Sequence, residues 1–127
     1  MAGPQGDVNS YMTVAAIHDI PNAAKFASDY KAKYGTEPGA YSASGYACAQ
    51  IYLQALAKVG SDREAVRNYV TTTANVFPTV LGNVSFDANG DTTQHIISYY
   101  KYDDATKDWK YFEQKDFTSG VTTTAAP

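Results

Sequence analysis

The sequence predicts an α/β fold, with helices in the first half of the chain and strands in the second. Apolar residues recur at helical spacing in three segments between Pro21 and Val70. From Thr79 onward the period changes to the alternation that is typical of strands. A short apolar run at residues 11–16 precedes the helices and predicts one buried strand. The 127 residues suffice for one domain.

The first helix is expected to begin near Pro21 and to end before Gly35. Proline is tolerated in a first helical turn, because the hydrogen-bond donor that it lacks has no partner there. Glycine just after the last helical residue favours a stop. One face of this helix carries five apolar or aromatic residues, which we expect to pack inward: Ala23, Phe26, Ala27, Tyr30 and Tyr34.

The second helix is expected to run from about Tyr41 to Val59. It is apolar on more than one side, which predicts burial between layers. Its Cys48 is expected on a buried face, as an inert small hydrophobe. The pattern Ser61-x-x-Glu64 resembles a capping box and predicts a third helix. The inner stripe of that helix is expected to consist of Ala65, Val66, Tyr69 and Val70.

The strands are expected at residues 79–86, 94–102 and 109–117. Asn89-Gly90 lies between the first two and accepts the positive φ angles of a hairpin turn. Asp87–Asp91 resembles a calcium loop in part, but the terminal Glu of an EF-hand is absent and a strand follows. Residues 1–10 are predicted to be a loop, 11–117 the folded segment, and 118–127 a disordered tail.

Composition excludes several classes of function. The net charge is −3 and no basic cluster stands out, so we expect no nucleic-acid partner. No apolar run approaches the roughly 20 residues that span a bilayer. The opening Met1–Pro4 has no charged or apolar signal region, so this chain is expected to lack a signal peptide. A single cysteine permits no internal disulfide.

No catalytic residue, metal or cofactor is expected. The sequence contains no nucleophile elbow, no phosphate-binding loop and no dinucleotide fingerprint. His18 beside Asp19 is the pair that comes nearest to a metal or catalytic site. A zinc site needs three or four ligands, and His95 is distant in the sequence. Solvated residues of a connecting segment are therefore the preferred interpretation of this pair.

Several strings in the sequence carry a resemblance to a known family. Phe26-x-x-x-Tyr30-x-x-x-Tyr34-Gly35-x-x-Pro38 is followed by Tyr41-x-x-x-Gly45-Tyr46, which opens a long alanine-rich helix. Val66-Arg67, Thr79–Asp91 and a tyrosine-rich strand before Trp109 come next. In this order and spacing, the strings resemble the branched-chain amino acid receptors among the periplasmic binding proteins of type I. The resemblance covers about residues 8–117.

The resemblance implies two Rossmann-like lobes that close on a small ligand by a hinge motion. It places the chain at the C-terminal end of such a receptor, as a fragment. The fragment would hold the late helices and hairpin of one lobe, and the last strands of the other. The crossovers between lobes would lie near residues 17–21 and 94–97. The implied hinge residues are Ile17, His18, Asp19, Gln94 and His95.

The implied function is recognition of an amino acid or small carboxylate for import by the membrane subunits of an ABC transporter. The intact protein would be periplasmic or extracellular, as a lipoprotein or secreted. Tyr41 would face the ligand, with Ser42 and Ser44 as hydrogen-bond donors at a helix N-terminus, where anions are favoured. Alternatively, Tyr41 packs on the adjacent loop and Ser42 is an ordinary cap.

The family's N-terminal portion is expected to be missing from this chain, which would leave the second helix exposed in a monomer. Three outcomes stay open: the rest lies on another polypeptide, two copies exchange elements, or the segment adopts a different small fold. Self-association is favoured, because large exposed apolar patches mark interfaces. The alternative function is therefore a self-associating structural segment that binds no ligand of its own.

Overall fold

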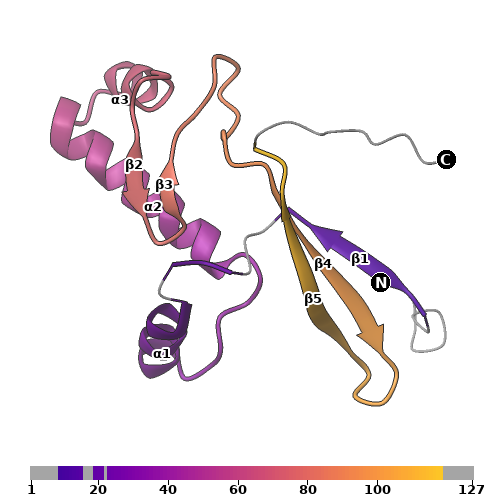
Figure 1. The fold of residues 1–127 in the computed structure, drawn as a ribbon. Coiled ribbons are helices and arrows are strands. Elements are labelled where there is room, and N and C mark those ends of the chain that lie inside the picture. Colours follow the sequence, from indigo (N-terminus) through magenta and orange to yellow (C-terminus); the bar gives the residue numbers. More distant parts are fainter. Residues whose placement is uncertain (1–8, 16–18, 22, 119–127) are drawn as a thin grey trace, which may run out of the picture. The chain divides into compact units, whose positions relative to one another are not determined.

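The structure, a computed structural model, describes residues 9–15, 19–21 and 23–118. Most of the predicted loop at 1–10 and of the predicted tail at 118–127 lies outside these ranges. The elements follow the order β1, α1, α2, α3, β2, β3, β4 and β5 (Figure 1). The chain divides into two compact units. Residues 1–18 and 95–127 form one, and residues 19–94 form the other.

The first unit is built on a three-stranded antiparallel sheet in the order β1-β4-β5 (Figure 1). Its strands are β1 (Tyr11–Val14), β4 (Ile96–Asp103) and β5 (Asp108–Asp116). β1 pairs with β4 so that Thr13 faces Tyr99, although the two residues are 86 positions apart in the sequence (99 − 13). Tyrosine and isoleucine dominate β4, and both favour strands. The predicted strands at 11–16, 94–102 and 109–117 are thus confirmed within two residues. The prediction that the first strand is buried is wrong, because only Val14 of β1 is buried and Tyr11 is 64% exposed.

The inner face of this sheet carries the buried residues of the first unit. Val14, Ser98 and Tyr102 are buried. The Ser98 hydroxyl donates to Oε1 of Gln114 on the neighbouring strand at 3.3 Å. The rings of Tyr102 and Trp109 meet edge to face at 5.5 Å, an arrangement that aromatic pairs prefer. Cross-strand aromatic contacts therefore hold β4 against β5.

The turn between β4 and β5 is organised by Asp103. Its carboxylate accepts hydrogen bonds from the Ala105 N–H and the Thr106 hydroxyl, each at 2.9 Å. These hydrogen bonds stabilise the charged carboxylate and therefore lower the pKa of Asp103. The bond from the Thr106 hydroxyl is the larger cause, followed by the bond from the Ala105 N–H. Lys107 adopts a positive φ of 54°. The aspartate-rich segment 103–108 is therefore a tight turn, as its composition predicts.

The second unit contains three helices and a hairpin: α1 (Ala23–Tyr34), α2 (Ser42–Val59), α3 (Arg63–Val70), β2 (Phe77–Thr79) and β3 (Gly82–Val84). Its core is a cluster of Ile51, Phe77 and Val84. Around this cluster pack half-buried apolar residues of α3 and of the segment after it: Tyr69, Val70, Leu81 and Phe86. The hairpin thus covers one side of α2 (Figure 1).

Helix α2 differs from expectation in what it buries. A single stripe of four residues is buried: Ala43, Ala47, Ile51 and Ala55. The opposite side is open, with Tyr52 and Leu53 exposed at 55% and 63%. The prediction of a buried Cys48 is wrong, because this residue is exposed. The hairpin covers one face of the helix, whereas Tyr52 and Leu53 on the other face are more than half exposed in the described residues. No helix in the described ranges is long and apolar enough to span a membrane.

The predicted strand at 79–86 is interrupted. Val80 and Leu81 form a two-residue turn between β2 and β3, and Gly82 follows with φ of +90°. Asp87–Asp91 does form a turn, which closes on an isolated bridge between Phe86 and Thr92. It does not join two strands of one sheet, because β4 pairs with β1 and β5 instead.

Two glutamines of α2 hold the β2–β3 turn against the helix. Oε1 of Gln50 accepts a hydrogen bond from the Val80 N–H at 2.8 Å. Nε2 of Gln54 donates to the Pro78 carbonyl oxygen at 3.1 Å. The two residues are one helical turn apart and therefore share a face. These bonds satisfy backbone groups of the turn that have no partner in the short hairpin.

Helix α3 begins one residue later than the capping-box pattern indicates. Its N-cap is Asp62, whose Oδ1 accepts from the Ala65 N–H at 2.8 Å. Ser61 was the predicted cap, and this assignment is wrong. Both residues are good caps, but the acid also complements the positive N-terminal end of the helix dipole. The predicted inner stripe is confirmed: Val66 is buried, and Ala65, Tyr69 and Val70 are half-buried.

The position of the cap can be tested by two alanine substitutions. Asp62→Ala is expected to lower the free energy of unfolding by about 1 kcal/mol, because the Ala65 N–H loses its acceptor. Ser61→Ala is the matched control and should change stability little. Urea denaturation measures both. Equal losses, or a larger loss for Ser61→Ala, would contradict this assignment.

The glutamine contact with the turn predicts a second effect. Gln50→Ala removes the acceptor of the Val80 N–H and is expected to cost about 1 kcal/mol. Gln50→Glu keeps an acceptor oxygen and should lose less. Hydrogen exchange resolves the effect at one site, because the Val80 amide should exchange faster in Gln50→Ala than in Gln50→Glu. Equal exchange in the two variants would count against the contact.

Candidate functional site

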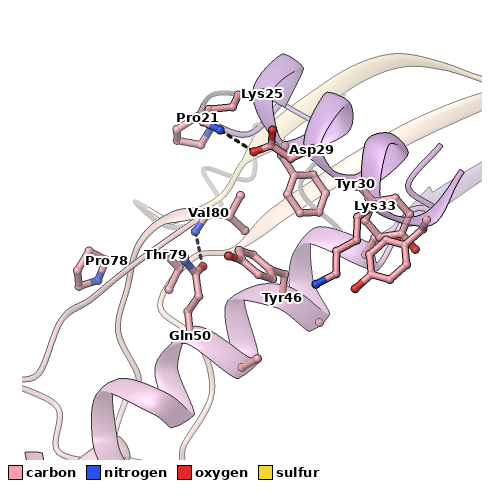
Figure 2. A pocket seen from close by; sticks show the side chains of 15 residues that line it. Pro21, Lys25, Asp29, Tyr30, Lys33, Tyr46, Gln50, Pro78, Thr79 and Val80 are labelled. Carbon is pink, nitrogen blue, oxygen red and sulfur yellow. Dashed lines mark hydrogen bonds and ion pairs between the residues drawn. The ribbon is translucent and has the colours of Figure 1, made fainter. Parts of the chain in front are cut away.

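A pocket of about 830 Å³ lies within residues 19–94 (Figure 2). Its lining comes from α1, from the first half of α2 and from the β2–β3 hairpin. The volume is in the range of small-molecule sites. The described residues that line it all belong to one compact unit. We therefore treat it as the candidate ligand site.

Aromatic rings of α1 form one wall. Phe26, Tyr30 and Tyr34 follow one another at spacings of four residues and line one side of the helix. Their ring centroids lie 6.0 Å apart for Phe26 and Tyr30, and 4.7 Å apart for Tyr30 and Tyr34. No residue of α1 is buried. The aromatic residues of the stripe predicted to pack inward thus form the open wall of a pocket, and Ala23 and Ala27 of that stripe are not among its lining residues.

Helix α2 supplies the opposite side. The Tyr46 ring lies 5.9 Å from the Phe26 ring, so the rings of α1 and α2 meet and form one aromatic wall. Gln50 follows one turn later, with its Oε1 engaged by Val80. Its Nε2 has no hydrogen-bond partner in the described part of the chain, so this donor is available to a ligand. Figure 2 shows Tyr46 and Gln50 between α2 and the hairpin turn.

Three charged side chains line the pocket. Lys25 and Asp29, one turn apart on α1, form an ion pair at 2.6 Å. The hydrogen bond to Asp29, together with its charge, raises the pKa of Lys25. Lys33 has no carboxylate partner among residues 9–15, 19–21 and 23–118, and its Nζ lies 5.6 Å from the centroid of the Tyr34 ring. The pocket therefore carries one uncompensated positive charge.

The predicted ligand residues Tyr41, Ser42 and Ser44 are not brought together in this pocket. Ser42 lines it, and its Oγ accepts a hydrogen bond from the Gly39 N–H at 3.0 Å. Tyr41 lies at the N-cap of α2, is 62% exposed and does not line the pocket. Ser44 is half-buried and also lies outside the lining. The ligand role of all three stays a prediction.

The predicted hinge residues lie at the boundary of the two units, which falls between residues 18 and 19 and between 94 and 95. Ile17 and His18 are outside the described residues. The Gln94 side chain donates to the carbonyl oxygens of Asn83 at 3.2 Å and Leu81 at 3.4 Å. The His95 N–H donates to the Thr118 hydroxyl at 3.2 Å. Neighbouring residues thus bond to different units; a hinge role for them, and for Asp19, stays a prediction.

Lys33, Tyr46 and Gln50 were missed as site residues. The aromatic repeat of α1 was visible in the sequence, but its pattern does not reveal whether a partner covers it. The sequence around Gln50 does not indicate a site residue, because this side chain is held by the N–H of Val80, which lies 30 residues further along the chain. In the described ranges no three side chains of the His, Cys, Asp or Glu type converge as a metal site.

Comparison with known proteins identifies the family. The family model described as periplasmic binding protein matches residues 2–107. None of the curated proteins matches the chain. The leucine binding protein LivK of Thermotoga maritima is similar at 28% identity and a TM-score of 0.65, over 84% of this chain and 30% of its own.

Two further solved structures show the same fold. A branched-chain amino acid ABC transporter periplasmic ligand-binding protein of Burkholderia xenovorans gives 17% identity and a TM-score of 0.64, over 92% of this chain and 33% of its own. A solute binding protein of Rhodopseudomonas palustris, solved with 3,4-dihydroxybenzoic acid, has 20% sequence identity and a TM-score of 0.60. This match covers 85% of the present chain and 31% of the Rhodopseudomonas chain. The chain spans about 30% of the length of LivK. It belongs to the periplasmic binding protein family, with a fold that matches part of the type I receptors of branched-chain amino acid ABC transporters.

Proposed function

We propose that the protein recognises a small solute, an amino acid or a small carboxylate, for import by an ABC transporter. The family match over residues 2–107 carries this proposal. The similar proteins include one named for leucine and one solved with an aromatic acid. Its partners would be the membrane subunits of the importer, and its location periplasmic or extracellular. The proposed role is binding, without chemistry on the solute.

The division of the chain supports a clamp mechanism. In the proposed receptor, each compact unit contributes to one of two lobes, and the connections at residues 17–19 and 94–95 act as hinges. Gln94 bonds to the hairpin of one unit, while His95 bonds to Thr118 of the other. Rotation about the backbone bonds between Gln94 and His95 would therefore move one unit against the other. Ligand binding favours closure only through higher affinity for the closed form.

The N-terminus of α2 is the proposed contact for an anionic group of the solute. Unpaired N–H groups and the helix dipole favour negative charge there. Tyr41 is exposed beside these groups, so it can contact a ligand without rearrangement. Ser42 and Ser44 would donate from the same turn. The rest of the solute's contacts would come from a longer polypeptide or a second chain.

Isothermal titration calorimetry of the full-length product of this gene tests the transport role. Leucine, valine, phenylalanine and 4-hydroxybenzoate are titrated in turn, with glucose as an unrelated solute. At least one amino acid or carboxylate should bind in a saturable manner, while glucose does not. The proposal is wrong if a broad panel of amino acids and organic acids gives no heat.

The open face of α2 supports a second candidate, a self-associating segment with no ligand of its own. Tyr52 and Leu53 are large, apolar and more than half exposed on one helix. Exposed apolar patches of this kind mark interfaces. Association with a second copy, or with a separate polypeptide that carries the rest of the receptor, would cover this face.

Light scattering of the 127-residue chain tests this second candidate. Leu53→Lys should shift an oligomer toward monomer, because a charge would be buried in the contact. Val76→Lys is the control, since Val76 is similarly exposed at 56% but lies outside α2. A chain that is monomeric without any substitution, and that binds ligand, would remove this candidate.

A further inference from the structure

The charges of the pocket between α1 and α2 do not balance. Lys25 and Asp29 neutralise each other through their ion pair. Lys33 remains as one cation without a carboxylate partner in the described residues. A ligand that matches this set carries a single negative charge. Figure 2 shows Lys33 extending from α1 into the space toward α2.

The walls of the same pocket select a flat ring. Phe26, Tyr30 and Tyr34 line it from α1, and Tyr46 lines it from α2. Aromatic rings pack on other rings in offset or edge-to-face arrangements and contribute beyond the area that they bury. Such walls hold a planar ring at several angles. Their open edges leave room for the ring to enter, since Tyr34 and Tyr46 are both more than half exposed.

We propose that this pocket binds an aromatic monocarboxylate, and prefers it to an α-amino acid. The inference rests on the proposed function, solute recognition, and adds a site and a ligand class. Lys33 would bind the carboxylate by a charge-assisted hydrogen bond, and the ligand's ring would pack against the wall formed by Tyr46 and the α1 aromatic residues. Nε2 of Gln50 would donate to a second oxygen of the ligand.

The preference against amino acids follows from the ammonium group. A zwitterionic ligand needs a carboxylate or several carbonyl oxygens for its ammonium. Among the described lining residues Asp29 is the one carboxylate, and its Oδ2 already pairs with Lys25 at 2.6 Å. The ammonium of an amino acid would have to share Asp29 with Lys25, and it would enter a lining in which two lysines already outnumber one aspartate.

The test measures the affinity of benzoate, benzamide and leucine for the full-length gene product by calorimetry. Benzoate should bind at least tenfold more tightly than benzamide, which keeps the ring but lacks the charge. Leucine should bind more weakly than benzoate. Lys33→Gln should weaken benzoate about fivefold, in line with a partly exposed charge pair. The same change at Lys31, which pairs with Glu37 outside the pocket, is the control.

A second pair of variants tests the aromatic wall. Tyr46→Leu should weaken benzoate several-fold, whereas Tyr52→Leu should not, although the two tyrosines share α2 and are exposed at 54% and 55%. Circular dichroism verifies that each variant is folded. Benzoate affinity that is unchanged by Lys33→Gln and Tyr46→Leu overturns the assignment of this pocket. Tighter binding of leucine than of benzoate overturns the ligand class while the transport role stands. No binding of any acid or amino acid refutes both.

Discussion

The pairing of β1 with β4 is the constraint on which the arrangement of the chain depends. It joins Tyr11–Val14 to Ser98–Lys101, so that each pair of residues is between 84 (98 − 14) and 90 (101 − 11) positions apart. Closing a flexible loop of that length costs about 4 kcal/mol in chain entropy. Residues 19–94 form their own compact unit, which shortens the effective loop. The pairing makes the first unit discontinuous, so that the chain leaves it once and returns once.

Within the second unit, helix α2 is the element against which the other segments pack. Its buried stripe consists of three alanines and Ile51, and such small side chains let neighbouring segments approach closely. Ile51 packs with Phe77 and Val84, while Gln50 and Gln54 bond to the turn between them. The same helix carries Tyr46 toward α1. One helix therefore positions both the core of the unit and one side of the pocket.

Much of this fold could be predicted from the sequence, because the signals that end elements are local. Gly35 and Gly60 mark the ends of α1 and α2, where both adopt positive φ angles. The break at Val80–Leu81 could not be predicted from alternation. Phe77 and Val84 share a face although they lie seven positions apart, so the two-residue turn shifts the alternation by one position. The apolar positions Val80, Val84 and Phe86 nevertheless continue at even spacing through the turn, so the sequence pattern reads as one strand. Ser61 and Asp62 are both good caps, and sequence alone does not choose between neighbours.

The candidate site was less predictable, for a different physical reason. Periodicity reveals which face of a helix is apolar, but not what covers that face. The stripe of Phe26, Tyr30 and Tyr34 was therefore interpreted as packing, whereas it lines a pocket. Lys33 stands out because Asp29, one helical turn away on α1, pairs with Lys25 instead. Such relations become visible only once the helices are placed.

Nuclear Overhauser contacts between β1 and β4 show whether these two strands pair. We expect backbone contacts in antiparallel register, with Thr13 opposite Tyr99 and Val14 opposite Ser98. Contacts shifted by one residue would place the buried Val14 on the other face of the sheet. Such a shift, or β4 contacts to β5 alone, would contradict the claim that residues 19–94 are inserted within a discontinuous first unit.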